Sequence, residues 1–284
     1  MSIVAQVERF AAMGTRVELH VFGGGFADAL VAAQRAIEDV DDALTIHRPS
    51  PTTAVNDGLL AGRSVAIDDP VLIEALIAIR DLYALTNGVF DPAIDRRFAG
   101  AAWDDVVFDP CTARIAATRP LALDFGGFGK GFALDRGGAV LRGAGVLCAC
   151  LSAGESSLAV IGEHPLGGGW PFAIPHPTRA DAVLVELELI DEALSISTTV
   201  GAGTDAPERA AMIRPSDGAI VTAARCAVAI DRSGGAAEAL STALLVADDD
   251  RTRRLLEGAP ARRFLYDLSQ EAATTVDVAR MQAA

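Results

Sequence analysis

The chain has 284 residues, of which 51% are hydrophobic and 22% charged, and its formal net charge is −14. This composition fits a globular protein of one large domain or two closely joined lobes, and it argues against nucleic acid as a partner, since phosphate backbones are bound by surplus lysine and arginine. No stretch reaches the roughly 18 uninterrupted apolar residues of a membrane span, and the N-terminal residues do not resemble a signal peptide, so we expect a cytoplasmic protein. The four cysteines include no C-x-x-C pair, which favours free thiols over a zinc site.

The N-terminal region predicts a strand followed by a long helix. Residues Thr15–Phe22 alternate between polar and apolar side chains, which is the period of a half-buried strand. After three glycines, apolar residues from Phe26 to Leu44 recur at helical spacing. An amphipathic helix should therefore pack back on this strand.

A loop and a second helix are predicted next. Residues 45–57 contain two prolines and several turn formers, so we expect a loop there. A helix should begin at Pro70, with Asp69 as its N-cap, and stop at the Asn-Gly pair at 87–88. Asp91 follows, next to a rigid proline, and a structural turn is the default expectation for such an Asp-Pro pair.

The most unusual stretch of the sequence lies between Leu121 and Leu134. A short, apolar, strand-like run ends at Asp124, and four glycines then leave room for the backbone to approach a ligand before a helix over residues 132–142. Lys130 lies among these glycines and is the only lysine of the chain. This reflects either coding bias or the need for a compact ammonium that contacts a ligand. The spacing matches neither a Walker loop nor G-x-G-x-x-G.

The second half of the chain mixes predicted strands and turns. A Ser-Ala-Gly-Glu-Ser segment interrupts the apolar region at 151–162, and the Pro-His-Pro sequence at 175–177 predicts a surface turn. Residues 183–190 read as a strand, and residues 195–205 read as a hydroxyl- and glycine-rich loop.

A helix with two candidate ligand residues is predicted near the C-terminus. It follows a turn at 212–218 and a buried strand at 226–230, and it runs from Ala236 to Val246. Glu238 and Thr242 lie four residues apart on one face of this helix. Taken alone, such a pair is usually a solvent-facing helix surface.

Several short motifs occur in the order that is typical of one protein family. They are Met-Gly-Thr at 13–15, the proline loop that ends at Asn56, Thr-Asn-Gly-Val-Phe-Asp-Pro at 86–92, Leu-Asp-Phe-Gly-Gly-Phe-Gly-Lys-Gly at 123–131, Ala-Gly-Glu at 153–155, the hydroxyl-rich loop near Ser197, Ile-Arg-Pro-Ser-Asp-Gly at 213–218 and Ala-Glu-Ala-Leu-Ser-Thr-Ala at 237–243. Each motif is weak alone. The ordered set, from about Phe10 to Val246, resembles the FAD:protein FMN transferase family, the ApbE-type flavin transferases.

The resemblance implies a fold and a reaction. The fold would be α+β, a single domain of two lobes at 8–270 with mixed, mainly antiparallel sheets flanked by helices, a ligand cleft between the lobes, and a C-terminal tail at 271–284. The reaction would be the Mg²⁺-dependent transfer of FMN from FAD to a threonine or serine hydroxyl of an acceptor protein, with AMP as the leaving group. The expected partners are therefore FAD and an acceptor flavoprotein.

The resemblance also implies the residues of the site. Magnesium would be held by the Gly129 carbonyl, Glu238 and Thr242, a set that suits an ion which prefers hard oxygen ligands and takes one or two carboxylates. Lys130 and Asp217 are the candidate catalytic residues. The candidate cofactor-binding residues are Met13, His47, Asp91, Asp124, Gly129, Lys130, Gly154, Glu155, Ser197, Thr198, Ile213 and Pro215.

The chain departs from the family pattern at several of these positions. Ala211 and Arg214 stand where the family has a histidine and an aspartate, Glu238 replaces the metal-binding aspartate, and His47 stands where an aromatic residue is common. Loss of a positioned base costs typically 10²–10⁴-fold in rate. Two alternatives to a transferase therefore stay open, a catalytically impaired FAD-binding carrier or regulator and an FAD pyrophosphate hydrolase.

Overall fold

A computed structural model describes residues 5–93, 97, 100–200, 212–269 and 274–275 as an α+β fold. Its strands are β1 Ala5–Ala12, β2 Thr15–Phe22, β3 Val65–Ala66, β4 Val106–Asp109, β5 Arg114–Ala117, β6 Ala149–Ala153, β7 Ser157–Ile161, β8 Trp170–His176, β9 Arg179–Leu189, β10 Ala193–Thr198, β11 Arg225–Asp231, β12 Arg263–Asp267 and β13 Thr274–Thr275. Its helices are α1 Ala27–Leu44, α2 Pro51–Leu60, α3 Pro70–Leu85, α4 Gly129–Gly143, α5 Gly234–Val246 and α6 Asp249–Glu257, with a short 3-10 helix at Trp103–Asp105. None of the helices in these ranges is long and apolar enough to cross a membrane.

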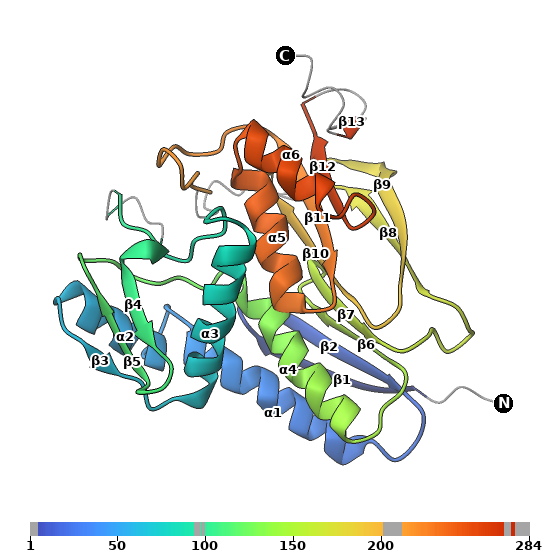
Figure 1. Ribbon diagram of the computed structural model, residues 1–284. Coiled ribbons are helices and arrows are strands. Elements are labelled where there is room, and N and C mark those ends of the chain that lie inside the picture. Colours follow the sequence, from blue (N-terminus) through green and yellow to red (C-terminus); the bar gives the residue numbers. More distant parts are fainter. Residues whose placement is uncertain (1–4, 94–96, 98–99, 201–211, 270–273, 276–284) are drawn as a thin grey trace.

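The main sheet has eight strands in the order β1-β2-β6-β7-β10-β11-β12-β13, and neighbouring strands pair antiparallel. Helices α1, α4 and α5 lie across one face of this sheet, and the β8–β9 hairpin lies beside it on the right of Figure 1. The alternation along β11 shows that both faces are covered. Ala227 and Ala229 belong to the core under the helices, whereas Val228 and Ile230 belong to a second core with Trp170 of the hairpin.

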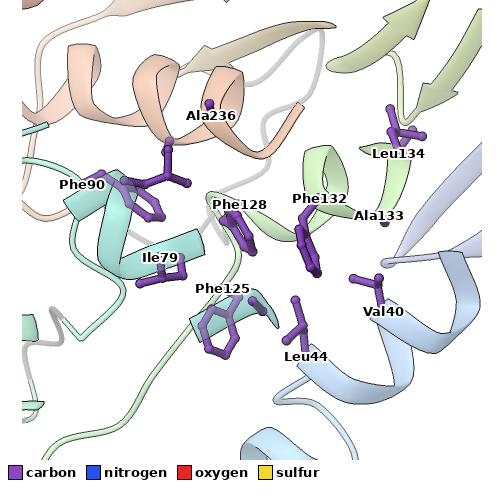
Figure 2. Packing of buried hydrophobic residues seen from close by; sticks show 14 of the residues in the cluster. Val40, Leu44, Ile79, Phe90, Phe125, Phe128, Phe132, Ala133, Leu134 and Ala236 are labelled. Carbon is purple, nitrogen blue, oxygen red and sulfur yellow. The ribbon is translucent and has the colours of Figure 1, made fainter. Parts of the chain in front are cut away.

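A smaller three-stranded sheet, in the order β3-β5-β4, lies with α2 and α3 on the left of Figure 1. One continuous apolar core joins it to the helical layer, because Ile115 of β5, Ile79 of α3 and Leu134 of α4 belong to the same buried cluster. Figure 2 shows Phe128 and Phe132 side by side in this interior, and their rings stack with centroids 4.9 Å apart.

The predictions for the N-terminal region are largely confirmed. The strand runs from Thr15 to Phe22 with its apolar face buried, the long helix follows, and Asp69 caps α3 by accepting a hydrogen bond from the Leu72 N–H at 2.8 Å. The predicted loop at 45–57 is wrong in its second half. Ser50 forms a capping box with Thr53, and the two prolines precede and begin α2 rather than exclude a helix.

The predictions for the central stretch need two corrections. Leu121–Leu123 is not part of a strand, because the Asn56 side chain, rather than a neighbouring strand, bonds both the N–H and the carbonyl of Leu123, at 2.8 and 2.9 Å. The helix begins at Gly129 rather than at residue 132. Lys130 therefore lies in the first turn of α4 and not in a loop.

Two further corrections concern the second half. Residues 195–198 belong to strand β10, because their backbone pairs with β11, so the predicted loop at 195–205 starts too early. The surface turn predicted at 175–177 begins only at Pro177, because His176 ends β8, is buried and pairs with Arg179 across the hairpin. The predicted strand Cys226–Ile230 and the helix from 236 to 246 are confirmed.

The C-terminal tail predicted from residue 271 lies mostly outside the described residues. Within it, Thr274 and Thr275 pair with β12. The domain boundaries at 8–270 stay a prediction.

Candidate functional site

A cavity of about 710 Å³ opens between the helical layer, the end of the main sheet and the β8–β9 hairpin. One wall is formed by α5, the glycine segment before α4 and the first turn of α4, which contribute Glu238 and Thr242, Gly127, and Lys130, respectively. The other walls come from β10, the β6–β7 turn, the hairpin and residues 212–215. The cavity therefore draws together residues that lie as far apart in the sequence as Val89 and Val246.

Lys130 and Glu238 form an ion pair in the helical wall of the cavity. The Lys130 Nζ lies 2.9 Å from the Glu238 Oε1, and 24% of the lysine side chain is exposed against 4% of the glutamate. A carboxylate that is this deeply buried needs both a counter-charge and hydrogen-bond donors. The ammonium supplies the counter-charge and remains partly open to the cavity.

Backbone and side-chain donors complete the environment of Glu238. The Gly131 N–H donates to Oε2 at 2.9 Å, and the Ser157 hydroxyl donates to Oε1 at 2.5 Å. The residue before α4, Phe128, makes no side-chain cap, so the N–H groups of the first turn need acceptors from outside the helix. Glu238 thus caps α4 from a different helix, and the positive end of the α4 dipole favours its charge.

Asp135 makes the reciprocal contact, from α4 to the start of α5. Its carboxylate accepts hydrogen bonds from the Ser233 hydroxyl at 2.7 Å and from the N–H groups of Gly234 and Gly235 at 2.6 and 3.0 Å. Burial raises the pKa of Asp135 and these hydrogen bonds oppose the shift. Each helix therefore supplies one carboxylate that caps the start of the other, and the two contacts hold α4 and α5 together where they cross.

Glycines make this crossing possible. A Cβ on Gly131 would overlap the carbonyl of Gly234, so the two backbones are in direct contact. A Cβ on Gly127 would lie 2.9 Å from the Thr242 Oγ1. The glycine loop therefore brings backbone against the same face of α5 that carries Glu238 and Thr242 into the cavity.

Asp91 is a buried carboxylate in another part of the cavity wall. Its oxygens accept hydrogen bonds from the Ala93 N–H at 2.8 Å and from the Trp103 N–H at 3.1 and 3.2 Å. Burial raises the pKa of Asp91 to about 6, while these backbone donors lower it. The predicted structural turn is confirmed, and the same side chain lines the cavity.

Serine hydroxyls from β10 and α5 form a connected row along one wall. The Ser241 Oγ lies 3.0 Å from the Ser195 Oγ and 2.8 Å from the Ser197 Oγ, and it donates to the Glu238 carbonyl at 3.0 Å. Ser195, Ser197 and their neighbour Thr198 line the cavity. These hydroxyls can donate to or accept from a polar ligand.

The turn between β6 and β7 forms the rim. Gly154 and Glu155 both have positive φ, at 62° and 59°, in the three-residue connection between the paired residues Ala153 and Ser157. A side chain on Gly154 would overlap Thr15, so this position is restricted to glycine. Glu155 projects into solvent with 89% of its side chain exposed and lies 3.7 Å from Arg16.

Met212, Ile213 and Pro215 line the opposite side of the cavity. They precede a turn in which Asp217 pairs with Arg214 at 3.0 Å. The Ala219 N–H donates to the same carboxylate at 3.0 Å, and this backbone bond, together with Arg214, lowers the pKa of Asp217. Asp217 is therefore ionised near neutral pH, and it is exposed rather than part of the cavity lining.

The cavity brings together most of the residues predicted for the site. Those that line it are Asp91, Asp124, Lys130, Gly154, Glu155, Ser197, Thr198, Ile213, Pro215, Glu238 and Thr242. Four predicted residues do not line it. Gly129 and Met13 lie against each other behind Lys130, since a Cβ on Gly129 would be 2.8 Å from the Met13 Cε, and His47 is exposed between α1 and α2, as Asp217 is on its turn. The roles of all these residues stay predictions, and Ala211 lies outside the described residues.

Sequence reasoning missed several polar residues of the site. Ser157 binds Glu238, and Ser195 and Ser241 form the hydroxyl row, while Cys226 lines the cavity as a buried free thiol. Buried serines within apolar strands are the signal that could have found Ser157 and Ser195. Nothing in the sequence marks Cys226, whose pKa is raised to about 12 by burial.

The donor set near Glu238 fits a hard divalent cation better than a zinc-like one. No group of three His, Cys, Asp or Glu side chains is placed to hold a metal ion within the described part of the chain. Glu238 and Thr242 nevertheless present a carboxylate and a hydroxyl to the cavity, and Gly129 starts the helix beside them. Oxygen ligands with one carboxylate suit Mg²⁺ that also binds phosphates and water.

Comparison with known proteins places the chain in a family and a fold. The profile of the ApbE family matches residues 13–264. Among curated proteins, FAD:protein FMN transferase from Rhodobacter capsulatus is 28% identical over 199 residues, which cover 60% of this chain and 37% of that protein. The chain thus spans little more than a third of the length of this relative.

Solved structures share the fold across almost the whole chain. Flavin transferase ApbE from Vibrio cholerae superposes with a TM-score of 0.81 at 18% identity and covers 99% of both chains. The apo form of Pseudomonas stutzeri flavinyl transferase ApbE gives 0.80 at 20% identity, covering 98% of this chain and 96% of that one. The ApbE protein from Thermotoga maritima gives 0.78 at 20% identity, covering 98% and 99%. The predicted α+β fold is confirmed.

Proposed function

Because this chain belongs to the ApbE family, we propose that it is a transferase that moves FMN from FAD to a threonine or serine hydroxyl of an acceptor protein and releases AMP. In this reaction the hydroxyl oxygen forms a bond to the FMN phosphorus, the phosphorus–oxygen bond to AMP breaks, and the hydroxyl loses its proton. One observation carries the proposal. The cavity of about 710 Å³ is large enough for a dinucleotide and has a single ammonium, on Lys130, beside a carboxylate and a hydroxyl.

The helical wall of the cavity suits the phosphates of FAD. Lys130 carries a compact charge at the positive end of the α4 dipole, and both favour an anion there. Glu238, Thr242 and the Gly129 carbonyl would hold Mg²⁺, which supplies charge neutralisation to the phosphates when bound. Positioning and charge stabilisation are most of what phosphoryl transfer requires of a protein.

The remaining walls suit the rest of the ligand and its acceptor. Ile174 and Pro175 of the hairpin and Ile213 offer apolar surface for ring systems, and the hydroxyl row at Ser195 and Ser197 offers polar partners. We assign the acceptor's proton to Asp217, because this carboxylate is ionised and follows residues that line the cavity. A cytoplasmic location stays a prediction from the sequence.

A second candidate, FAD binding without transfer, is favoured by the surroundings of Asp217. Its carboxylate is already engaged by Arg214 and a backbone N–H, so it is a weak proton acceptor. The double change Ala211→His, Arg214→Asp should then raise the transfer rate, since an imidazole accepts a proton near neutral pH.

Incubation with FAD and Mg²⁺, with and without a threonine-bearing acceptor peptide, tests these alternatives. Transfer predicts AMP release that depends on the peptide, together with covalent flavin on the threonine. AMP release that is independent of the peptide would indicate hydrolysis of FAD, and FAD binding without AMP release would indicate a carrier or regulator. The absence of FAD binding by calorimetry would contradict all three functions.

A further inference from the structure

The charges that line the cavity do not match the proposed ligand. The lining includes four carboxylates, those of Asp91, Asp124, Glu155 and Glu238, and one ammonium, that of Lys130, and no other lysine or arginine among the described residues lines the cavity. A dinucleotide would add two further negative charges at its phosphates. Lys130 is therefore the one basic side chain of this lining that can contact them, and it is already paired with Glu238.

Lys130 contacts only one of the two carboxylate oxygens of Glu238. Its ammonium lies 2.9 Å from the Glu238 Oε1, the same atom that accepts the Ser157 hydroxyl at 2.5 Å. The Oε2 atom accepts only the Gly131 N–H. Because a carboxylate oxygen has two lone pairs, Oε1 is fully used and Oε2 has one lone pair left.

We propose that the Lys130 ammonium is the resident cation of Glu238, and that a divalent cation arriving with the nucleotide displaces it and frees it to contact a phosphate. The inference rests on the proposed function, since it takes the ligand to be a nucleotide with a pyrophosphate. Ammonium and metal ion compete for one carboxylate, so each weakens the binding of the other. A phosphate that attracts the ammonium away from Glu238 strengthens metal binding, and by linkage the metal strengthens phosphate binding equally.

Two consequences follow for binding in the absence of FAD. The wild-type protein should bind a divalent cation weakly, because the metal must displace an ion-paired ammonium. Removal of the ammonium should tighten metal binding by about tenfold, the equivalent of a partly buried ion pair of about 1.4 kcal/mol. ADP, which carries a pyrophosphate, should tighten metal binding in the wild type more than in a variant without the ammonium.

The test is a titration of Mg²⁺ alone, and then of Mg²⁺ with ADP, followed by calorimetry on the full chain. We compare the wild type with Lys130→Met and Lys130→Gln, two neutral replacements of similar length. Arg136→Met is the matched control, since it removes one positive charge from the same helix, where Arg136 pairs with Glu74 and not with a cavity residue. Thermal unfolding without metal establishes that the variants are folded.

The expected result is about tenfold tighter Mg²⁺ binding in both Lys130 variants, with an Arg136→Met value close to wild type and a smaller effect of ADP once Lys130 is lost. Equal Mg²⁺ affinity in the wild type and the Lys130 variants would overturn the inference, as would an equal gain in Arg136→Met. A parallel FAD titration separates the two proposals. If FAD binds but the Lys130 variants have the same Mg²⁺ affinity as the wild type, only the displacement of Lys130 by the metal is refuted. If FAD does not bind at all, the proposed function is refuted.

Discussion

Two sides of the cavity are built in opposite ways. On the helical side, Gly131 and Gly234 bring the backbones of α4 and α5 into contact, and Asp135 and Glu238 each bond the start of the other helix. On the opposite side, the turn after Pro215 is exposed. An ion pair joins Arg214 to Asp217 at the surface.

The two sides differ in how far their residues are needed for stability as well as for ligand binding. At the α4–α5 crossing the groups that would meet phosphate also hold two helices together, so a substitution there changes stability and binding at once. At the turn, side chains can change with little cost to the fold. Of the departures from the family pattern, Ala211 and Arg214 lie on or before this turn in the sequence, whereas at the crossing Glu238 stands for an aspartate and so keeps a carboxylate.

The largest effect is expected from Gly131→Ala, which breaks the crossing itself. The added methyl group would overlap the Gly234 carbonyl, which is backbone and does not move aside as a side chain would. We expect a loss of about 4 kcal/mol or more of unfolding free energy, measured by denaturant titration, because strained overpacking of a core is among the most destabilising changes. Gly143→Ala is the control on the same helix, since its methyl group would meet nothing within 4 Å and alanine is the better helix former. Similar stability of the two variants would contradict direct backbone contact at the crossing.

Asp135→Asn should have the next largest effect. The amide keeps the shape of the side chain but removes the charge that three donors at the start of α5 now share. We expect a loss of about 3 kcal/mol of unfolding free energy, because hydrogen bonds to a charged group contribute more than neutral ones. Asp181→Asn, on exposed β9 surface, is the matched control and should leave the unfolding free energy nearly unchanged. A loss confined to less than about 0.5 kcal/mol would mean that the crossing is held by packing alone.

Asp91 is a buried carboxylate away from the crossing, and its effect should show in the pH dependence of the unfolding free energy. Its pKa is about 6 in the folded protein, against an ordinary value of 3.8, because burial outweighs its backbone donors. The folded state thus binds more protons than the unfolded state between these values, so this residue's contribution to stability is present below pH 4 and is lost as pH rises through 6. Relative to wild type, Asp91→Asn should gain about 2 kcal/mol of unfolding free energy between pH 4 and pH 7. Parallel pH profiles of the two proteins would contradict a raised pKa.

The smallest effect is expected from Arg214→Ala at the turn. The pair with Asp217 is solvent-exposed, and such pairs contribute about 0.2–1 kcal/mol at most. The unfolding free energy should change by less than about 0.5 kcal/mol, while the rate of flavin transfer to the acceptor peptide rises as Asp217 is released. A drop in stability comparable with that of Asp135→Asn would show that the turn also supports the fold.

Periodicity predicted the regular elements well. The alternation at Thr15–Phe22 reflects burial on one face, whereas the helix that ends at Val246 is apolar nearly all round and is buried on almost every side; both patterns are local in the sequence. The short stretch at Leu121–Leu123 looked like a strand for the same reason. Its partner is the Asn56 side chain, 67 residues away, and no local pattern indicates such a contact.

For the site, the sequence predicted the main polar residues but not their contacts. Ordered motifs drew attention to Lys130, Glu238 and Thr242, and the structure places them on one wall. The partners of Glu238 were not predicted, because Ser157 and the Gly131 N–H reach it only through the packing of α4 and β7 on α5. The residue types show which charges and hydrogen-bonding groups a site can offer, but the partners of each group depend on which helices and strands pack together.

The most direct test is whether FAD occupies the cavity. Ser156 lines it from the end of the β6–β7 turn, so Ser156→Trp should fill part of the space and leave the buried core untouched. We predict that calorimetry finds one FAD site in the wild type, and that Ser156→Trp weakens FAD binding at least tenfold, by roughly 1.4 kcal/mol, with an unchanged melting temperature. Equally tight FAD binding by the wild type and by folded Ser156→Trp would contradict the placement of the flavin nucleotide in this cavity.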